Sequence, residues 1–475
     1  MSARNLGRTP RRLLIGSVVL IGAGALVAAR PAAAPAAADG RFALTGNSNA
    51  AVELGKKLPS FSRQTHLACS ACHYQFPQLT PFGRQFKLNG YTLSGLPEIT
   101  QKDSAERQTL KLSPISPVAA MIVVSHTSLN TTIPGTANGT VLFPDQLSLF
   151  YAGELTPKIG AFMQLTYSAP DGAIGIDNVD LRFADRTTLG GKQFVYGLSL
   201  ENNPTVQDVW NTVPAWGYPF MSSPIAPTPT AATIIDGALG QQVAGLGVYG
   251  FWNSLVYAEF TGYARAPQGV PFPLDSSVTG VINGFTPYWR VALQKQWGNE
   301  YLEVGTFGMQ THLLPTGYSG PSNQLTDIAG DAQFEHKTGS GVLIGRFTYI
   351  HERQTLDATY AAGGASNLDN SLNSWKLNAS YDPSLLLGFT LGAFGTTGTT
   401  DQLLYAPGSV AGSATGSPNS DGWIAEFNYN PWQNTRLALQ YTGYTRFNGG
   451  SSNYDGSGRS ASANNTVYVY LWMAF

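Results

Sequence analysis

Cysteine is almost absent from this sequence. Only two of its 475 residues are cysteines, Cys69 and Cys72, and His73 follows the second one directly. A zinc site needs four ligands, and no second cysteine pair is present to complete one. A disulfide that spans two intervening residues would add little stability. The role of this single pair must therefore come from its own motif.

Long apolar runs are also missing after the first forty residues. Beyond that point no run is long enough for a transmembrane helix. Charged residues make up only 12% of the chain, whereas aromatic residues reach 11% and there are 53 glycines. Nothing in this composition suggests nucleic-acid binding. Low charge together with many aromatic residues is what a membrane β-barrel requires.

The first 38 residues have the layout of a secretory signal peptide. A basic start over residues 4–12 precedes an apolar run over 13–29, and small residues follow up to Ala38. We predict cleavage after Ala38. The alternative, a membrane anchor, is disfavoured because the run is short and its exit is rich in Ala and Pro. Cleavage removes five arginines and changes the formal charge from −1 to about −6.

From about residue 115 to 475 the chain alternates between apolar and polar residues. In one segment Val179, Leu181 and Phe183 alternate with Asp180 and Arg182. Such alternation predicts half-buried strands. Short turns are expected near residues 156–158, 187–191, 252–254, 298–299, 337–340, 382–385 and 431–434. Longer connections are expected near residues 131–144, 168–177, 202–243, 266–284, 312–328, 354–370, 397–421 and 447–464.

Seven short turns that alternate with eight long connections predict sixteen antiparallel strands. This is the plan of a bacterial outer-membrane β-barrel, with short periplasmic turns and long outer loops. The last segment has an apolar face that ends in Phe475, as in the terminal strand of such barrels. A soluble β-sandwich or repeat protein would also alternate, but only closure lets such a sheet span lipid. The longest connection, 202–243, is expected either to fold over the outer mouth or to be a solvated loop.

The motif C-x-x-C-H over residues 69–73 is the attachment signature of c-type haem. The thiols of Cys69 and Cys72 would bond the two vinyl groups of the porphyrin, and His73 would be the proximal iron ligand. A thioredoxin-like C-x-x-C would need a βαβ context, which is absent around it. The sequence therefore predicts one covalent haem c.

A helix over residues 80–90 is expected after the motif. Thr80 would be its N-cap, with Pro81 at the first helical position and Asn89-Gly90 as the stop signal. Phe82 and Phe86 are candidates for packing on the porphyrin, or else belong to the core of a small domain. Arg63, Arg84 and Lys87 are candidate partners of the haem propionates, or else are surface charges.

The distal ligand of the haem iron is left open by the sequence. No methionine occurs between residues 41 and 112, and His66 lies too close to Cys69 to reach the opposite face easily. Met121 and His126 lie on the first predicted strand and are further candidates. A methionine ligand would raise the potential relative to a second histidine, and an open position would allow ligand binding instead.

The stretch "PSFSRQTHLACSACHYQFPQLTPFGRQFKLNGYTLSG" over residues 59–95, followed by a barrel, resembles the fused cytochrome–porins of the bacterial outer membrane. The best-known members are iron-oxidising outer-membrane c-type cytochromes, and "YIHERQTLDATY" over 349–360 is similar too. The resemblance implies an Fe(II) oxidase. Electrons would pass from extracellular Fe(II) through one haem to a periplasmic cytochrome or copper protein.

These expectations divide the chain into a signal peptide over 1–38, a small α-helical monohaem cytochrome domain over 39–112, and an all-β barrel over 113–475. The apolar band of a barrel is about 25 Å tall. A barrel of sixteen strands leaves a lumen, so we expect the haem domain to lie at least partly inside it. One chain supplies a full barrel, so we expect a monomer. A diffusion porin with a structural haem segment, and an outward electron conduit or haem sensor, remain alternatives.

Overall fold

A computed structural model of the chain describes residues 58–93, 99–132, 136–266, 281–315, 320–408, 412–432 and 434–475. The side chains of residues 108–112 are not described. The predicted signal peptide, the predicted cleavage site and the first part of the predicted haem domain, up to residue 57, lie outside the described residues. Those three features stay predictions.

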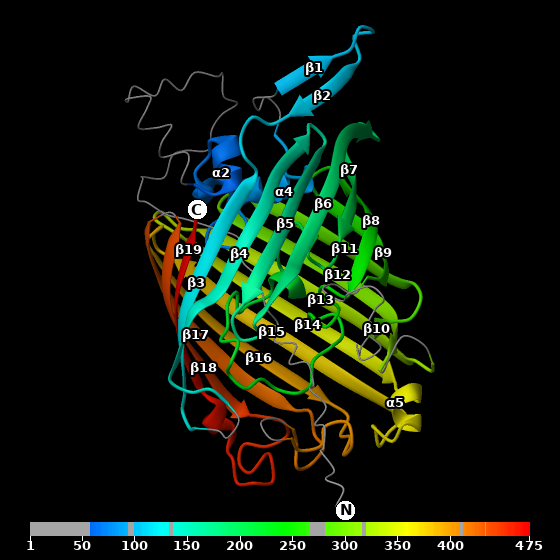
Figure 1. Ribbon diagram of the computed structural model, residues 1–475, viewed down its shortest axis with the longest axis vertical. Coiled ribbons are helices and arrows are strands. Elements are labelled where there is room, and N and C mark those ends of the chain that lie inside the picture. The colour runs from blue at the N-terminus through cyan, green and yellow to red at the C-terminus, as the bar shows by residue number, and fades with distance from the viewer. Residues whose placement is uncertain are drawn as a thin grey trace, which may run out of the picture.

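Most of the described chain forms one closed antiparallel β-barrel (Figure 1). Sixteen strands follow one another around the ring, which closes where β19 pairs with β3. A two-residue strand, β10 (Val281–Ile282), adds to the edge of β12. The predicted strand number is therefore confirmed. The barrel strands are β3 (Val118–Leu129), β4 (Thr140–Thr156), β5 (Ile159–Ser168), β6 (Ala173–Leu189), β7 (Lys192–Glu201), β8 (Val243–Trp252), β9 (Val256–Arg265), β11 (Thr286–Trp297), β12 (Glu300–Leu314), β13 (Asn323–Lys337), β14 (Val342–Thr355), β15 (Asp369–Asp382), β16 (Leu387–Gly398), β17 (Ser420–Trp432), β18 (Thr435–Arg446) and β19 (Thr466–Ala474).

The barrel is apolar outside and polar inside. Large apolar side chains such as Leu246, Leu293 and Leu391 are exposed on its outer surface. Charged side chains such as Arg182 and Arg290 are fully buried on the inner face. A soluble β-sandwich would show the opposite arrangement, whereas a barrel surrounded by lipid requires this one. The chain is therefore a β-barrel of the bacterial outer membrane. Among the described residues, no helix is long and apolar enough to cross a membrane.

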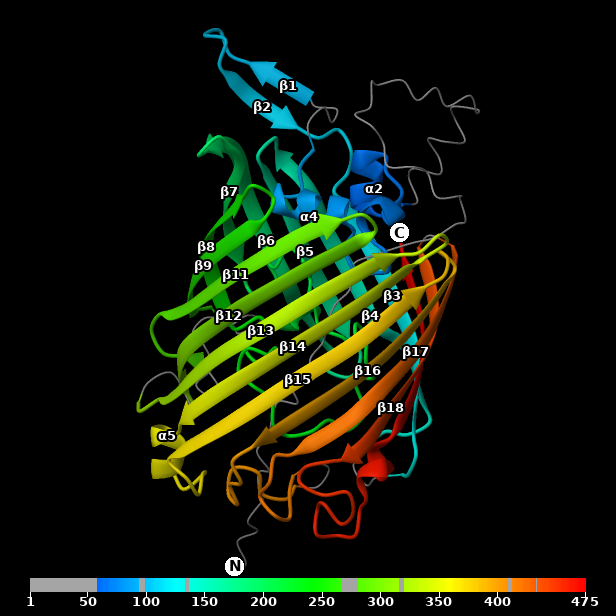
Figure 2. The same ribbon diagram turned by 180° about the vertical axis from the view of Figure 1, so that it is seen from behind.

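The short turns lie where the alternation predicts them, at one end of the barrel (Figures 1 and 2). The long connections lie at the other end, together with the short helices α5 (Asp357–Ala361) and η2 (Ala461–Asn464). The connection expected at 168–177 is shorter, because β6 begins at Ala173 and pairs with Ser168. Strand pairing beyond the apolar band depends on backbone hydrogen bonds, so side-chain alternation does not mark these strand ends.

Residues 58–93 form a plug segment at the short-turn end of the barrel (Figures 1 and 2). It contains the helices α2 (Ser60–Thr65), α3 (Cys69–Cys72) and α4 (Pro81–Leu88). Helix α4 confirms its predicted signals. The Thr80 hydroxyl accepts a hydrogen bond from the Gly83 N–H at 3.1 Å, and Gly90 follows the helix with a φ of +69°. Beyond the plug, a hairpin of β1 (Ile99–Lys102) and β2 (Gln108–Leu112) projects past the end of the barrel.

The plug segment lies inside the lumen, because its side chains bond to strands on opposite sides of the ring. The hydroxyl of Tyr91 donates to Asp180 on β6 at 2.6 Å, and the amide of Gln78 donates to Ser380 on β15 at 2.9 Å. The hydroxyl of Tyr74 donates to Glu335 on β13 at 2.8 Å. The predicted insertion of this segment is confirmed for residues 58–93. In outer-membrane barrels the short turns face the periplasm, so the plug occupies the periplasmic end.

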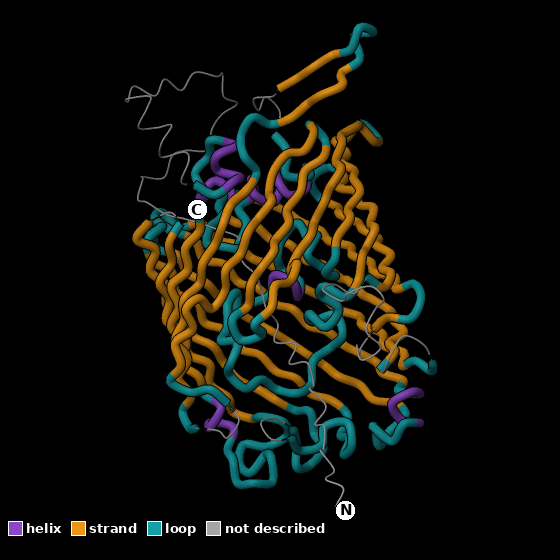
Figure 3. Tube along the Cα trace, in the orientation of Figure 1, coloured by secondary structure: helices purple, strands orange, loops and turns teal. Residues whose placement is uncertain are grey.

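The long connection between β7 and β8 also enters the lumen (Figure 3). This inserted loop, residues 202–242, contains the short helix η1 (Pro214–Trp216) and buries Trp210 and Phe220 completely or nearly so. The side-chain amide of Asn211 donates to the carbonyl of Pro77 in the plug at 3.0 Å. The predicted solvated loop is therefore wrong, whereas the Pro/Thr/Ala-rich stretch 222–233 reaches the long-loop end, where the Thr230 N–H donates to the side-chain oxygen of Asn448 at 3.0 Å. The apolar side chains of the inserted loop are buried against the plug and the inner wall.

Candidate functional site

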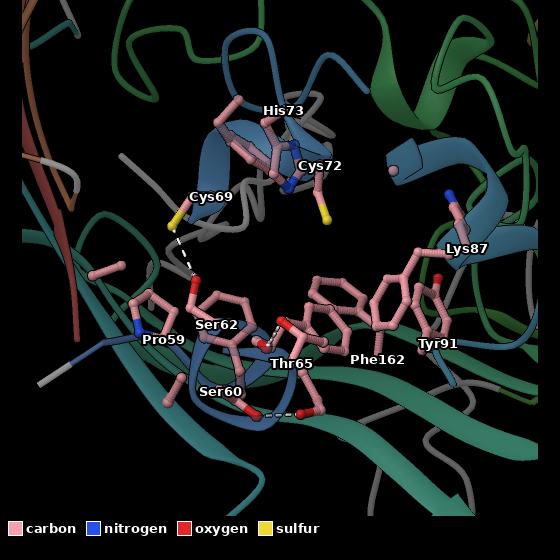
Figure 4. Close-up of a pocket in the computed structure, with 18 of the residues that line it drawn as sticks. Pro59, Ser60, Ser62, Thr65, Cys69, Cys72, His73, Lys87, Tyr91 and Phe162 are labelled. Atoms are coloured by element: carbon pink, nitrogen blue, oxygen red, sulfur yellow. Dashed lines mark hydrogen bonds between the residues drawn. The ribbon is translucent and has the colours of Figure 1, made fainter. Parts of the chain in front are cut away.

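A cavity lies between the plug segment and the barrel wall (Figure 4). It encloses about 1030 Å³ of space, including its opening. Its walls come from α2, α3 and α4, from the ends of β3, β4, β5 and β19, and from the inserted loop.

The one-turn helix α3 presents Cys69, Cys72 and His73 to this cavity (Figure 4). The N–H of His73 donates to the carbonyl of Cys69 at 2.9 Å, and His73 itself is extended, so its ring turns back over the turn. Both thiols are free. Helix α4 fixes α3 from the other side, since Gly83 packs directly on the carbonyl of Cys72 and leaves no space for a Cβ atom. The predicted haem motif is thus assembled on one wall.

Burial controls the protonation of these three side chains. It raises the pKa of Cys72 to about 12, with a further contribution from neighbouring Cys69. It also raises the pKa of Cys69, although a contact with the Ser62 hydroxyl at 3.2 Å opposes this shift. Burial and the charge of Arg436 lower the pKa of His73 to about 4. At neutral pH the imidazole is therefore neutral, which is the form that ligates a metal.

The opposite wall of the cavity is aromatic. The ring of Phe61 stands edge-on to Phe86 at 5.1 Å and stacks on Tyr91 at 5.5 Å. Phe162 from β5 and Trp216 from the inserted loop extend this surface, with their ring centroids 6.3 Å apart. A flat apolar cofactor fits between such a surface and α3. The Nδ1 atom of His73 is buried without a hydrogen-bond partner of ordinary geometry among the described residues.

Of the predicted packing residues and propionate partners, some line the cavity and others do not. Phe86 lines the cavity, but Phe82 does not and is 40% exposed. Arg84 is buried in an ion pair with Glu335, 4.0 Å above the ring of Tyr301, and is turned toward the barrel wall. Arg63 donates to backbone carbonyls at the start of β3. The three side chains Phe82, Arg84 and Arg63 do not line the cavity, because each is fixed by contacts elsewhere or faces solvent.

Lys87 is the predicted cation that does line the cavity. Its ammonium group donates to the carbonyl of Val206 and to the side-chain oxygen of Asn211, both at 2.8 Å. It lies 4.7 Å from the ring centre of Trp216. Burial and the charge of Arg182 lower the pKa of Lys87 to about 7.

None of the three candidate distal ligands lines the cavity. Met121 is fully buried on the inner face of β3, in the same apolar cluster as Phe86, but behind the cavity wall. His66 is exposed and ends helix α2 with a φ of +56°. His126 lies on the outer, lipid-facing side of β3, since the inner face carries the odd-numbered residues. The strand alternation that buries Met121 therefore directs His126 away from the lumen.

Sequence reasoning missed the contribution of the inserted loop. Asn211 and Trp216 reach the cavity from a segment more than 130 residues away from the cysteines. No local signal pointed to this contact. Phe150 and Ala152 of β4 also line it. For these two residues the sequence did contain a signal. Both share a face with polar Ser148 in the alternating pattern, and this polar face is the inner face of the barrel.

No family model matches the chain, and no curated protein matches it. Several solved outer-membrane proteins are similar in structure, and each covers 75% of this chain. The anion-selective porin of Comamonas acidovorans is 13% identical over 98% of its own length, with a TM-score of 0.41. The outer-membrane expressed OmpT of Vibrio cholerae is 9% identical over 97%, also at 0.41. The outer membrane channel DcaP of Acinetobacter baumannii is 10% identical over 96%, again at 0.41.

Proposed function

We propose that this porin-like outer-membrane barrel is a c-type cytochrome that holds one covalent haem c in the plug cavity. Cys69 and Cys72 would form the two thioether bonds, and His73 would be the proximal iron ligand. One observation carries the proposal. The thiols of Cys69 and Cys72 and the ring of His73 face the same large cavity, opposite an aromatic wall.

The remaining lining residues have clear roles in such a site. The aromatic rings of Phe61, Phe86 and Tyr91 exclude water and support a flat macrocycle. Among the described residues that line the cavity, Lys87 is the lysine or arginine that would pair with a propionate in its protonated form. A haem bound here supplies a one-electron redox centre, and its axial ligands set the potential.

We further propose that the electron donor is extracellular Fe(II) and that the acceptor is a periplasmic cytochrome or copper protein. One electron leaves Fe(II), which becomes Fe(III), and the same electron is passed on to the acceptor. The resemblance of residues 59–95 supports the donor. The position of the plug at the short-turn end supports the acceptor, since that end faces the periplasm. We expect the protein to act as a monomer in the outer membrane.

An anaerobic reduction experiment tests this function. The chain is expressed with c-type haem maturation, purified from outer membranes and oxidised before Fe(II) is added. We expect the absorption bands of the reduced haem to appear rapidly, and to be absent from a Cys69→Ala/Cys72→Ala variant. A haem that dithionite reduces but Fe(II) does not would reject Fe(II) as donor. A wild-type chain without covalent haem would reject the cytochrome itself.

A diffusion porin is the second candidate function. The closed sixteen-stranded barrel favours it, since barrels of this size form aqueous channels. The plug segment and the inserted loop both occupy the lumen, however, and join each other through Asn211 and Pro77. A porin would conduct ions through planar bilayers at the level of open sixteen-stranded channels, whereas the cytochrome is expected to conduct far less.

A further inference from the structure

A second cavity lies in the lumen between the inserted loop and the strands β14 and β15. It contains about 410 Å³ of space, including its opening to solvent. Trp216 lines this cavity as well as the plug cavity, so one indole borders both. The second cavity differs in chemistry, because its wall on β14 and β15 carries Arg346, Lys376 and Asn378 beside Ile350 and Trp375.

Two side chains on this wall have hydrogen-bond donors without partners. Arg346 is 5% exposed, and its Nε donates to the side-chain oxygen of Gln333 at 2.8 Å. Its Nη1 and Nη2 atoms have no partner among the described residues. Asn378 lies directly opposite Arg346 in the pairing of β14 with β15, is also 5% exposed, and leaves its Nδ2 unpaired. Three N–H-bearing atoms without partners therefore belong to residues that line one cavity.

No carboxylate among the described residues accepts a hydrogen bond from Nη1 or Nη2 of Arg346, although Glu335, Asp208 and Glu303 act on its charge from a distance. Asp236 lines the cavity but is held by Lys376, whose ammonium group contacts its two oxygens at 3.1 and 2.8 Å. Glu335 forms its ion pair with Arg84. A buried guanidinium is costly unless an anion or another acceptor pairs with it. The two Nη atoms of Arg346 thus lack a bonded acceptor among the described residues, and an oxyanion would supply one.

We propose that this cavity binds a small oxyanion of the phosphate type, held by the guanidinium fork of Arg346 and the amide of Asn378. Two parallel N–H donors of arginine match two oxygens of a phosphate or carboxylate group. Two groups with this chemistry could occupy the site. One is a free inorganic oxyanion, and the other is a propionate of a cofactor that reaches past Trp216. We assign the free oxyanion, because Trp216 stands between the two cavities. The proposal does not depend on the proposed function.

Calorimetric titration of the full chain with inorganic phosphate tests this site. The protein is purified without phosphate, and ionic strength is kept constant with chloride. We expect one phosphate per chain, and a loss of affinity of at least tenfold in Arg346→Gln. Arg353→Gln is the matched control, since Arg353 lies on the same strand but is exposed on the outer face. It should leave phosphate binding unchanged.

Two further measurements keep the outcome clear if Arg346→Gln folds poorly. Arg346→Lys keeps the charge but loses the fork, so it should bind phosphate more weakly than the wild type. Phosphate should also raise the unfolding temperature of the wild type and of Arg353→Gln, but not that of Arg346→Gln. Equal phosphate binding by wild type and Arg346→Gln would overturn the proposal. Binding only by the Cys69→Ala/Cys72→Ala variant would also overturn it, and would identify a propionate as the occupant.

Discussion

At the scale of single residues, the contact between Gly83 and Cys72 determines how the cysteine motif is presented. A Cβ atom at position 83 would overlap the carbonyl of Cys72, which is backbone and cannot rotate away. The sequence predicted helix α4 and the haem motif separately, from local signals. It could not predict that they touch, because this contact depends on the turn at residues 74–79. The pairing of His73 with Leu79 across that turn brings them together.

The variant Gly83→Ala tests this contact. We expect it to push α4 from α3 and to destabilise the plug by about 1–3 kcal/mol, as overpacked cores usually do. The covalent haem content per purified barrel should fall. The control is Gly345→Ala on β14, where a Cβ atom would meet nothing within 4 Å. An unchanged haem content in Gly83→Ala would show that α3 tolerates the displacement.

Lys87 makes the stability of the plug dependent on pH. Its pKa is about 7 in the folded chain and 10.5 when exposed, because burial disfavours the charged amine. Between these values the unfolded chain binds more protons, so the free energy of unfolding rises with pH, by at most about 1.4 kcal/mol per pH unit. Below pH 7 the contribution of Lys87 to the free energy of unfolding no longer changes with pH. The urea concentration at which trypsin cleaves the plug should rise from pH 7 to 10 in the wild type, and less in Lys87→Met.

At the scale of elements, a buried ion pair fixes the plug to the wall, and hydrogen bonds to buried carboxylates fix the inserted loop. Arg84 and Glu335 join α4 to β13, with 4% and 1% of their side chains exposed. Asp327 and Glu352 accept the backbone N–H groups of Ile235 and Ile234 in the inserted loop. Glu352 belongs to the stretch 349–360 noted in the sequence. Its described contacts place it as an anchor of the inserted loop.

Removing one partner of the Arg84–Glu335 pair should release the plug. Glu335→Gln leaves a buried guanidinium with no opposite charge, which costs roughly 3–5 kcal/mol. We expect the plug to be cleaved by trypsin at a lower urea concentration while the barrel stays folded. Glu106→Gln is the control, because its pair with Lys102 is 81% and 60% exposed and worth only about 0–1 kcal/mol. If Glu335→Gln behaved like Glu106→Gln, the pair would not hold the plug.

The sequence predicted the strands of the barrel wall better than the segments that lie inside the barrel. Strand alternation is local, so it gave all sixteen strands and every short turn. The inserted loop has no period, and its burial depends on Trp210 and Phe220 meeting residues far away in the chain. The polar residues that hold it, such as Asp327, also read as ordinary inner-face positions. Such long-range contacts leave no pattern in a single sequence.

At the scale of the whole molecule, the barrel is a filled cylinder. The plug occupies the short-turn end and the inserted loop lies beyond it in the lumen. We expect single-channel conductance in planar bilayers to be several-fold below that of a variant that lacks residues 59–93. High conductance in that variant, together with low conductance in the wild type, would show that the wall forms a channel and that the plug closes it. Similar conductance in both would mean that the inserted loop alone closes the lumen.

The closure of the ring between β3 and β19 has a consequence for biogenesis. Every other joint of the barrel connects strands that follow one another along the chain, but this seam connects residues 118–129 with residues 466–474. The plug and then the β1–β2 hairpin precede β3 in the chain, and the closed barrel surrounds the plug and buries Cys69. Cys69 is only 7% exposed in the closed barrel, so an enzyme would reach its thiol less easily there than in the unfolded chain. We therefore expect any covalent loading of this chain to be completed in the periplasm, before β3 pairs with β19 in the membrane.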